Sequence, residues 1–589
     1  MRMKTFFPLL SILAISGALL AQDLPVETLA SDLKVLRDSR TKEIVSVIVQ
    51  FKPGAKMKNQ GRSRLLSRGA VERLDLVESI LVDIPADQLD ALAADPAVEY
   101  VSPDRQVNAN LDLIQPTVRA DIALANNFTG KGIGIAIIDS GVSAHSDLSY
   151  LVTNNLSRIV YSENFVHSDT TTDDLYGHGT HVAGIAAGNG ASSSASLNNK
   201  TFRGMASAAT IVNLRALDAH GVGTDSQVIA AINRAIALKE TYNIRVINLS
   251  LGRAVMESYQ TDPLGRAVAR AVDQGIVVVV AAGNYGRDNT FNTHGYGLIT
   301  SPGNHPRVIT VGAMKTRETI ARADDEIASY SSKGPTMIDR IAKPDLVAPG
   351  NRVASLLTLK SYFANEYPAN SIPLAYYTLT TDSFLHNLVG VISSPTYYRL
   401  SGTSMSAPVV SGAVALMLQK DPTLSPDTIK ARLMKTATKT FPTTSTATDP
   451  VSGEVFVSQY DIFTIGAGYL DVWAAMNSTE VAKLPALSPA VKYDPKTKQA
   501  YFVKDTSALW GSSAAWGSSA VWGSNSFTGT SSAAWGSSAL WGSSAAWGSS
   551  AAWGSSALWG SSAAWGSSAL WGSSTPQAEK LDVLVRGEK

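Results

Sequence analysis

The sequence predicts an α/β protein whose main domain is a parallel sheet with helices on both of its faces. Short apolar runs alternate with longer helical patterns from residue 132 to about residue 476, and the runs are apolar at nearly every position. Strands that are buried on both faces have this continuous pattern, and the intervening helices indicate parallel pairing. Functional groups in such sheets lie beyond the carboxyl ends of the strands. The apolar runs occupy residues 133–138, 209–214, 246–249, 276–280 and 308–311.

The composition excludes several classes of chemistry. With 589 residues, of which 45% are hydrophobic, the chain is long enough for several domains. A formal net charge of +1 provides no general field that would attract nucleic acid, so no nucleic-acid partner is expected. The sequence contains no cysteine, which excludes disulfides, thiolate metal sites and a cysteine nucleophile. A hydroxyl nucleophile remains available.

Residues 1–21 have the pattern of a secretory signal peptide. A basic start precedes an apolar run over residues 6–21, and the first acidic residue is Asp23. This pattern predicts a secreted or extracellular protein. A retained membrane anchor is the alternative. Signal peptidase sites have a small residue three positions before the cut, and for a cut after Ala21 that residue is Leu19. We expect the mature form not to span a membrane, since no later segment has about 18 uninterrupted apolar residues.

A small α/β domain is predicted at residues 43–106, near the lower size limit for independent folding. The basic stretch at residues 52–73 is interpreted as a solvated loop. Strands are expected at residues 44–51, 80–84 and 98–101, with a helical pattern at residues 87–92.

Three motifs place polar side chains at the ends of predicted elements. The first buried strand ends at Asp139, which puts a carboxylate where the strand meets a loop. His178 begins a helical pattern that continues to Ala187, so its side chain is presented at a helix start. Ser404 lies at the start of a long apolar helix that continues through Leu418.

These three residue types can form a nucleophilic site. A serine hydroxyl is a weak nucleophile and needs a base, and a histidine base needs a carboxylate that fixes its tautomer and stabilises its protonated form. Each signal alone is weak, because Asp-Ser-Gly occurs by chance in loops and a serine at a helix start is commonly a cap. Their occurrence in one parallel-sheet pattern, each at the end of an element, favours a catalytic site.

The motifs resemble the three signature segments of the subtilisin-like serine proteases, the subtilases. The matching segments are Asp139-Ser-Gly, Gly177-His-Gly-Thr-His and Gly402-Thr-Ser-Met-Ser-Ala-Pro, in the family's order of Asp, His and Ser. On this resemblance we place a peptidase domain at residues 112–478. It implies that Asp139 orients His178, that His178 acts as general base and then general acid, and that Ser404 forms an acyl-enzyme.

The resemblance also implies binding residues for a polypeptide substrate. Asn284 matches the family's oxyanion-binding amide, although an asparagine that ends a buried strand in a turn is common without such a role. Thr300 is expected at the far end of the primary pocket, which implies a mid-sized apolar side chain before the cut. Two segments are expected to flank an extended substrate: Ser250, Leu251 and Gly252 on one side, and Ala281, Ala282 and Gly283 on the other.

A metal site is the alternative interpretation of the histidine motif. His181 lies three residues after His178, so the two side chains could share a helix face. No motif supplies the third protein ligand that a catalytic zinc needs, and a packing role is expected for His181. No cofactor is required. Residues 197–200 resemble a shortened calcium loop that carries Lys200, so structural calcium stays undecided.

Residues 43–106 resemble the inhibitory propeptides of the subtilases. The resemblance implies an intramolecular inhibitor that also acts as a folding template. Its last strand leads into the active site, which the end of the segment would occupy as a reaction product does. We expect the mature chain to start between Val107 and Leu113. An unrelated N-terminal domain is the alternative.

Residues 507–574 form a tail that repeats Trp-Gly-Ser-Ser-Ala-Ala with small variations, and no charged residue occurs from residue 506 to residue 578. A period of six returns to the same face of a strand, which favours extended structure over helix. Two interpretations stay open: a small β-solenoid whose stacked coils bury the tryptophans, or a Gly/Ser-rich tail without fixed structure. Either arrangement suggests adhesion to a surface, to a polymeric substrate or to itself.

The predicted function is a secreted serine endopeptidase that hydrolyses peptide bonds through an acyl-enzyme and is made as a self-inhibited, autoprocessed precursor. Two other classes were weighed. A surface-binding protein could carry the tail on an inactive protease scaffold, but all three motifs are intact. A metal-dependent hydrolase that uses His178 and His181 lacks further ligands.

Overall fold

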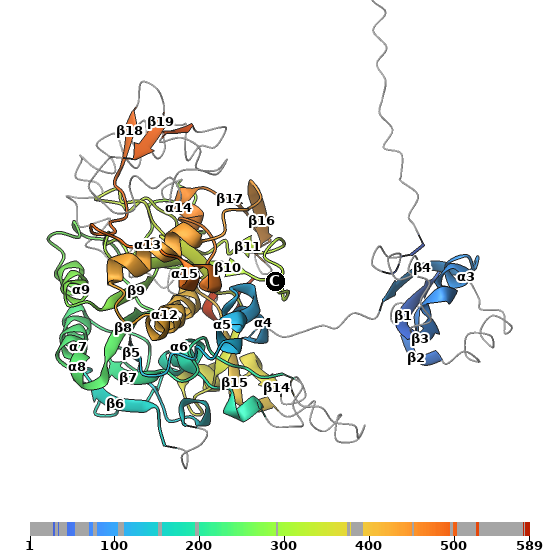
Figure 1. The fold of residues 1–589 in the computed structure, drawn as a ribbon, viewed down its shortest axis with the longest axis horizontal. Coiled ribbons are helices and arrows are strands. Elements are labelled where there is room, and N and C mark those ends of the chain that lie inside the picture. Colours follow the sequence, from blue (N-terminus) through green and yellow to red (C-terminus); the bar gives the residue numbers. More distant parts are fainter. Residues whose placement is uncertain are drawn as a thin grey trace, which may run out of the picture. The chain divides into compact units, whose positions relative to one another are not determined.

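The computed structural model contains two compact units of the chain, Met1–Val107 and Asn108–Lys589 (Figure 1). The predicted signal peptide lies outside the described residues, and within the predicted tail only Ser526–Thr528 is described. The described residues are 28–29, 33, 44–52, 70–74, 79–103, 111–150, 156–194, 200–289, 293–373, 377, 393–449, 453–494, 499–502, 526–528, 581 and 583–588.

The first unit is a four-stranded antiparallel sheet with a short helix. Its elements are β1 (Ile44–Phe51), β2 (Ala70–Leu74), β3 (Ser79–Pro85), α3 (Leu89–Ala93) and β4 (Val98–Pro103). The strand order is β2-β3-β1-β4, and side chains of β1, β3, α3 and β4 share one core. The structure differs from the prediction at the basic stretch, whose end forms β2 and pairs with β3. A short strand at a sheet edge needs no apolar run, so its sequence pattern is weak.

The main sheet of the second unit is parallel, as predicted, except for a short antiparallel edge strand. Its order is β11-β10-β9-β8-β5-β7-β6, and β12 also pairs with β10. The chain adds strands first on one side of the central strand β5 and then on the other. Such a reversal is a topological switch point, where α/β sheets bind ligands. The strands are β5 (Gly134–Asp139), β6 (Ile159–Asn164), β7 (Thr210–Arg215), β8 (Ile244–Leu249), β9 (Val277–Ala281), β10 (Ile309–Lys315), β11 (Glu326–Ile327) and β12 (Leu346–Pro349).

Helices cover both faces of this sheet (Figure 1). Ile135 and Ile137 of β5 belong to a core cluster with one set of helices, α6 (His178–Ala187), α12 (Thr403–Lys420) and α13 (Pro426–Thr436). Ala136 and Ile138 belong to the cluster on the other face with α7 (Asp225–Ala237) and α9 (Pro263–Asp273). Because successive side chains of a strand point to opposite faces, the continuous apolar runs are explained by burial on both sides.

Two parallel strands escaped the sequence analysis, β6 and the buried strand β12, which is only four residues long and pairs with β10. β6 pairs with β7 at the edge of the sheet, and most of its residues are only half-buried. An edge strand that contacts helices weakly does not need a continuous apolar run. The prediction from apolar runs therefore found β5, β7, β8, β9 and β10 and missed β6, β11 and β12.

Smaller elements surround the main sheet. In the described part of the chain no helix is both long and apolar enough to cross a membrane. The remaining helices are α4 (Leu111–Thr117), α5 (Ala120–Ala125), α8 (Lys239–Tyr242), α10 (Tyr362–Glu366), α14 (Ile462–Ile465) and α15 (Val472–Asn477). The remaining strands form three antiparallel groups: β13 (Val353–Leu356) with β15 (Ser393–Leu400) and β14 (Ser371–Pro373), β16 (Thr444–Thr448) with β17 (Val455–Gln459), and β18 (Val491–Asp494) with β19 (Gln499–Phe502) and β20 (Ser526–Thr528).

Candidate active site

The carboxylate of Asp139 lies at the carboxyl end of the central strand β5, at the switch point of the sheet. Its side chain is fully buried. The Oδ1 atom accepts a hydrogen bond from the backbone N–H of Ser140 at 2.7 Å. The strand and the residue that follows it therefore fix the carboxylate at the edge where the sequence predicted it.

His178 is the first residue of α6, and its Nδ1 atom lies 2.7 Å from Oδ1 of Asp139. The preceding Gly177 has a φ of 98°, and a Cβ there would lie only 2.6 Å from Oγ of Ser361, so glycine is required. A carboxylate only accepts hydrogen bonds, so Nδ1 carries the proton and Nε2 is the basic nitrogen. Burial lowers the pKa of His178, but the charge and hydrogen bond of Asp139 outweigh burial and hold the pKa above its ordinary value.

A second buried carboxylate, Asp174, fixes the start of α6. Its Oδ1 accepts hydrogen bonds from the Ser140 hydroxyl at 2.8 Å and from the Gly177 N–H at 2.7 Å, and its Oδ2 accepts one from the Thr180 N–H at 2.7 Å. Helix N-terminal N–H groups have no partner within the helix, so Asp174 satisfies them. Sequence reasoning missed this residue because the N-cap position is Gly177. The signal that the sequence offered was the acidic residue itself, which lies shortly before the start of the predicted helix.

Ser404 lies in the first turn of α12, and it is the only residue from Ser401 to Leu418 that is not buried. Its hydroxyl donates to the carbonyl oxygen of Ser250 at 3.2 Å, and its own carbonyl accepts from the Ser250 hydroxyl at 2.8 Å. Ser250 directly follows β8, which pairs with β5, so Ser404 and Asp139 lie at the same sheet edge. Among the described residues, the hydroxyl of Ser404 bonds to this carbonyl and not to His178, and a side-chain rotation would release it.

Asn284 is held against the segment that leads to Ser404. Its Oδ1 accepts hydrogen bonds from the backbone N–H of Thr403 at 2.9 Å and from the Thr403 hydroxyl at 3.0 Å. The oxygen side of the amide is thereby occupied, which leaves the NH₂ group of Asn284 as the donor available beside Ser404. Gly402 makes room for this amide, since a Cβ there would lie 3.0 Å from Asn284 Nδ2. Thr403 has no sequence signal for this role.

The two predicted substrate-flanking segments meet at Thr300. A Cβ on Gly252 would lie 2.5 Å from Thr300 Oγ1, and a Cβ on Gly283 would lie 2.8 Å from Thr300 Cγ2. The Thr300 N–H also donates to the carbonyl of Ala282 at 3.1 Å. Leu251 and Gly283 are partly exposed and Gly252 is exposed, whereas Ala281 and Ala282 are buried.

His181 packs between two strands of the small sheet. Its Nε2 lies 3.1 Å from the carbonyl oxygen of Val353 in β13 and 3.0 Å from that of Tyr398 in β15. Burial, and then the charge of His178, lower the pKa of His181 to about 3, so this imidazole is neutral. Within the described ranges no group of three or more His, Cys, Asp or Glu side chains is placed to hold a metal ion. Residues 195–199, with most of the calcium-like segment, lie outside those ranges.

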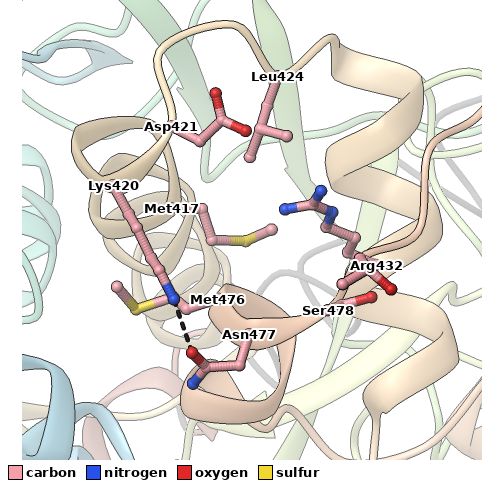
Figure 2. A pocket seen from close by; sticks show the side chains of 9 residues that line it. Met417, Lys420, Asp421, Leu424, Arg432, Met476, Asn477 and Ser478 are labelled. Carbon is pink, nitrogen blue, oxygen red and sulfur yellow. Dashed lines mark hydrogen bonds between the residues drawn. The ribbon is translucent and has the colours of Figure 1, made fainter.

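A pocket lies at the opposite end of α12 from Ser404 (Figure 2). Its volume is about 510 Å³, and Lys420 donates to Asn477 Oδ1 across it at 2.6 Å. The 18 residues of α12 span about 27 Å, so this pocket is remote from Ser404. None of the predicted site residues lines it.

The fold and the family comparison together define a serine-type endopeptidase. The sequence profile of the subtilase family matches residues 130–453, more than half of the chain, and the chain belongs to this family. The predicted family and enzyme class are therefore confirmed.

Individual relatives support the same class. The chain is 32% identical to the serine protease AprX of Bacillus subtilis (strain 168) over 412 residues, which cover 67% of this chain and 83% of that protein. It is 33% identical to subtilisin DY of Bacillus licheniformis over 326 residues, which cover 55% and 90%. It is 30% identical to the extracellular serine proteinase of Thermus sp. (strain Rt41A) over 373 residues, which cover 62% and 71%.

Proposed function

We propose that this endopeptidase acts through Asp139, His178 and Ser404, and that it is secreted as a self-inhibited precursor that processes itself. The single observation that carries the catalytic assignment is the exposure of Ser404 within an otherwise buried stretch from Ser401 to Leu418. A fully buried serine could serve packing alone, whereas Ser404 is partly exposed at the sheet edge that holds Asp139.

The proposed reaction is acyl transfer. Ser404 Oγ attacks the scissile carbonyl carbon, and its proton passes to Nε2 of His178. Asp139 keeps His178 in the tautomer that has Nε2 free, and its negative charge stabilises the imidazolium. His178 then gives the proton to the leaving amine, and water releases the acyl group by the same steps in reverse.

The developing oxyanion would be bound by the NH₂ group of Asn284 and the backbone N–H of Ser404. The Asn284 amide is oriented before substrate arrives, because Thr403 holds its oxygen with two hydrogen bonds. A donor that is fixed in advance needs no reorganisation during the reaction, which is the main source of its catalytic value.

A polypeptide substrate would bind as an extended strand between Ser250–Gly252 and Ala281–Gly283. Hydrogen bonds to the substrate backbone do not depend on its sequence, so many sequences can bind. The preference for the substrate side chain before the cut would come from the space near Thr300. The methyl and hydroxyl groups of Thr300 narrow that space from both walls, which favours a mid-sized apolar side chain before the cut.

The proposed inhibitor, residues 43–106, lies within the first unit, Met1–Val107, whose core also includes Leu29 and Leu33. It has its own hydrophobic core, and residues 104–110 connect its last strand β4 to the peptidase unit. Secretion is supported by the N-terminal signal pattern and by a relative that is named an extracellular proteinase.

The tail at residues 507–574 is proposed to adhere to a surface, to polymeric substrate or to other copies of itself, because its tryptophans recur without any charge. Circular dichroism of residues 507–574 alone would distinguish its two candidate structures. A coil spectrum at low concentration would exclude the solenoid.

Processing of the precursor tests the proposed function. Wild type and Ser404→Ala would be expressed without residues 1–21, and the mature N-terminus would be sequenced. Cleavage between Val107 and Leu113 is expected in wild type only. Ser406→Ala is the matched control, since Ser406 is on the same helix but buried and donates to the Ala348 carbonyl at 3.0 Å. Equal processing of purified Ser404→Ala would overturn the serine mechanism.

A further inference from the structure

Residues 583–588, which follow the tryptophan repeat, pack back onto the peptidase unit. Val583 is 3% exposed and shares a core cluster with Ala313, Ala328 and Tyr330. Leu584 and Val585 pack against the main core cluster. An apolar side chain from the end of the chain therefore completes a cluster that β10 begins, and this segment is part of the folded unit.

Glu588 inserts its carboxylate among three donors. Oε1 accepts hydrogen bonds from the Ser329 N–H and from Nη2 of Arg287, each at 2.9 Å, and it also contacts the Ser329 hydroxyl. Nζ of Lys315 lies 3.8 Å from Oε2. The side chains of Glu588 and Arg287 are only 3% and 6% exposed. A buried carboxylate is tolerated only where charge and hydrogen bonds compensate its lost hydration. Arg287 and Ser329 do so at Oε1, and the charge of Lys315 faces Oε2, which accepts no hydrogen bond from the described residues, so these residues form a site for an acid.

The backbone of the segment is recognised as well. The amide of Asn351 accepts from the Glu588 N–H at 2.8 Å and donates to the Glu588 carbonyl at 2.7 Å. The Ser401 N–H donates to the Leu584 carbonyl at 2.8 Å. Gly587 has a φ of 62°, and a Cβ there would overlap the Ser401 hydroxyl. The site therefore selects a glycine followed by an acid.

The same contacts reach the loop that leads to Ser404. Asn351 follows Gly350, whose carbonyl accepts from the Gly402 N–H at 2.8 Å. Ser401 directly precedes Gly402 and donates to the C-terminal segment. Residues 583–588 thus hold both chain segments that meet just before the nucleophile.

We propose that residues 583–588 are an intramolecular ligand, a C-terminal anchor for which the peptidase unit carries a dedicated peptide-binding site around Arg287, Ser329, Asn351 and Ser401. Along the sequence, the repeat lies between β19 and this anchor, and Ser526–Thr528 within it pair with β19. The anchor also braces Ser401 and Gly402, the two residues that lead into α12 and Ser404.

Retention of a severed anchor tests the site without relying on catalysis. The recognition sequence of an unrelated site-specific protease is inserted after Ala578 in the full-length Ser404→Ala chain. After cleavage, the C-terminal peptide is expected to co-elute with the protein in size-exclusion chromatography. Glu588→Ala and Gly587→Val should each raise its dissociation constant by about 30-fold or more. Glu579→Ala, which removes the same charge from the same terminal segment, is the matched control.

The outcomes are decisive for the anchor. Retention of the wild-type and Glu579→Ala peptides, with loss of the other two, supports the site. Loss of the wild-type peptide at micromolar concentration, or equal retention of all four peptides, overturns it. The Gly587→Val variant changes no charge, so it separates the fitted backbone from simple ionic attraction.

The brace is tested in the active chain and rests on the proposed function of Ser404. Glu588→Ala should lower kcat by about 10-fold or more and leave KM within about twofold, because the nucleophile is displaced and the substrate-flanking segments are not. An unchanged kcat in a variant that releases its anchor would refute the brace alone. Inactivity of wild type would instead count against the proposed function.

Discussion

The backbone N–H of Thr403 donates to Oδ1 of Asn284 at 2.9 Å, so the residue before the proposed nucleophile orients the proposed oxyanion donor. The two residues are 119 positions apart in the chain. The orientation of the Asn284 amide and the position of the Ser404 hydroxyl are therefore linked through Thr403.

Replacement of Asn284 by alanine should lower kcat by about 100-fold or more, which corresponds to roughly 3 to 4 kcal/mol of transition-state stabilisation. Folding should be kept, because Asn284 is only partly buried. Thr403→Val should have a smaller effect, since the Thr403 N–H still holds the amide. Steady-state kinetics measures the activity of both variants, and thermal unfolding measures their stability. A wild-type rate in Asn284→Ala would contradict the proposed role of Asn284 as oxyanion donor.

The pH profile should report the raised pKa of His178. The general base must be neutral, so kcat/KM should fall as pH decreases through this pKa, and the acidic limb should lie above the ordinary value of 6.5. Asp139→Asn removes the charge that raises the pKa, so the limb should move to lower pH and kcat should fall by about 10⁴-fold. A limb that does not move in Asp139→Asn contradicts the assignment of the titrating group.

Removal of the Asp174 carboxylate should destabilise the fold. Asp174→Ala leaves two backbone N–H groups and the Ser140 hydroxyl without this acceptor, which should cost about 2 to 4 kcal/mol of unfolding free energy. The exposed neighbour Asp173 gives a matched control, and Asp173→Ala should change stability by less than about 0.5 kcal/mol. Urea unfolding of the two variants makes the comparison, and equal stabilities would show that the cap is dispensable.

Thr300 should limit the size of the side chain that is accepted before the cut. Thr300→Gly removes both groups that approach Gly252 and Gly283, so kcat/KM for large aromatic residues should rise about 10-fold relative to small ones. Thr300→Ser keeps the hydroxyl near Gly252 and loses the methyl near Gly283, so its preference should be intermediate. Competition between peptide substrates that differ at this one residue measures the ratio. An unchanged ratio in both variants would place the selecting residue elsewhere.

The sequence by itself determined the class of fold, because continuous apolar runs are required where a strand is buried on both faces. It also located Asp139, His178 and Ser404 at element ends, since an element's end is marked by a local change of residue pattern. Local patterns failed at the edge strand β6, whose weaker burial imposes no such run.

Only the tertiary structure decided which distant groups support the site. Asp174 contacts Ser140 across 34 positions, Thr403 contacts Asn284 across 119, and Glu588 contacts Ser329 across 259. A hydrogen bond requires a donor and an acceptor within about 3 Å of each other. A local sequence pattern cannot predict such a contact between distant residues, because the contact depends on how the folded sheet places its loops relative to one another.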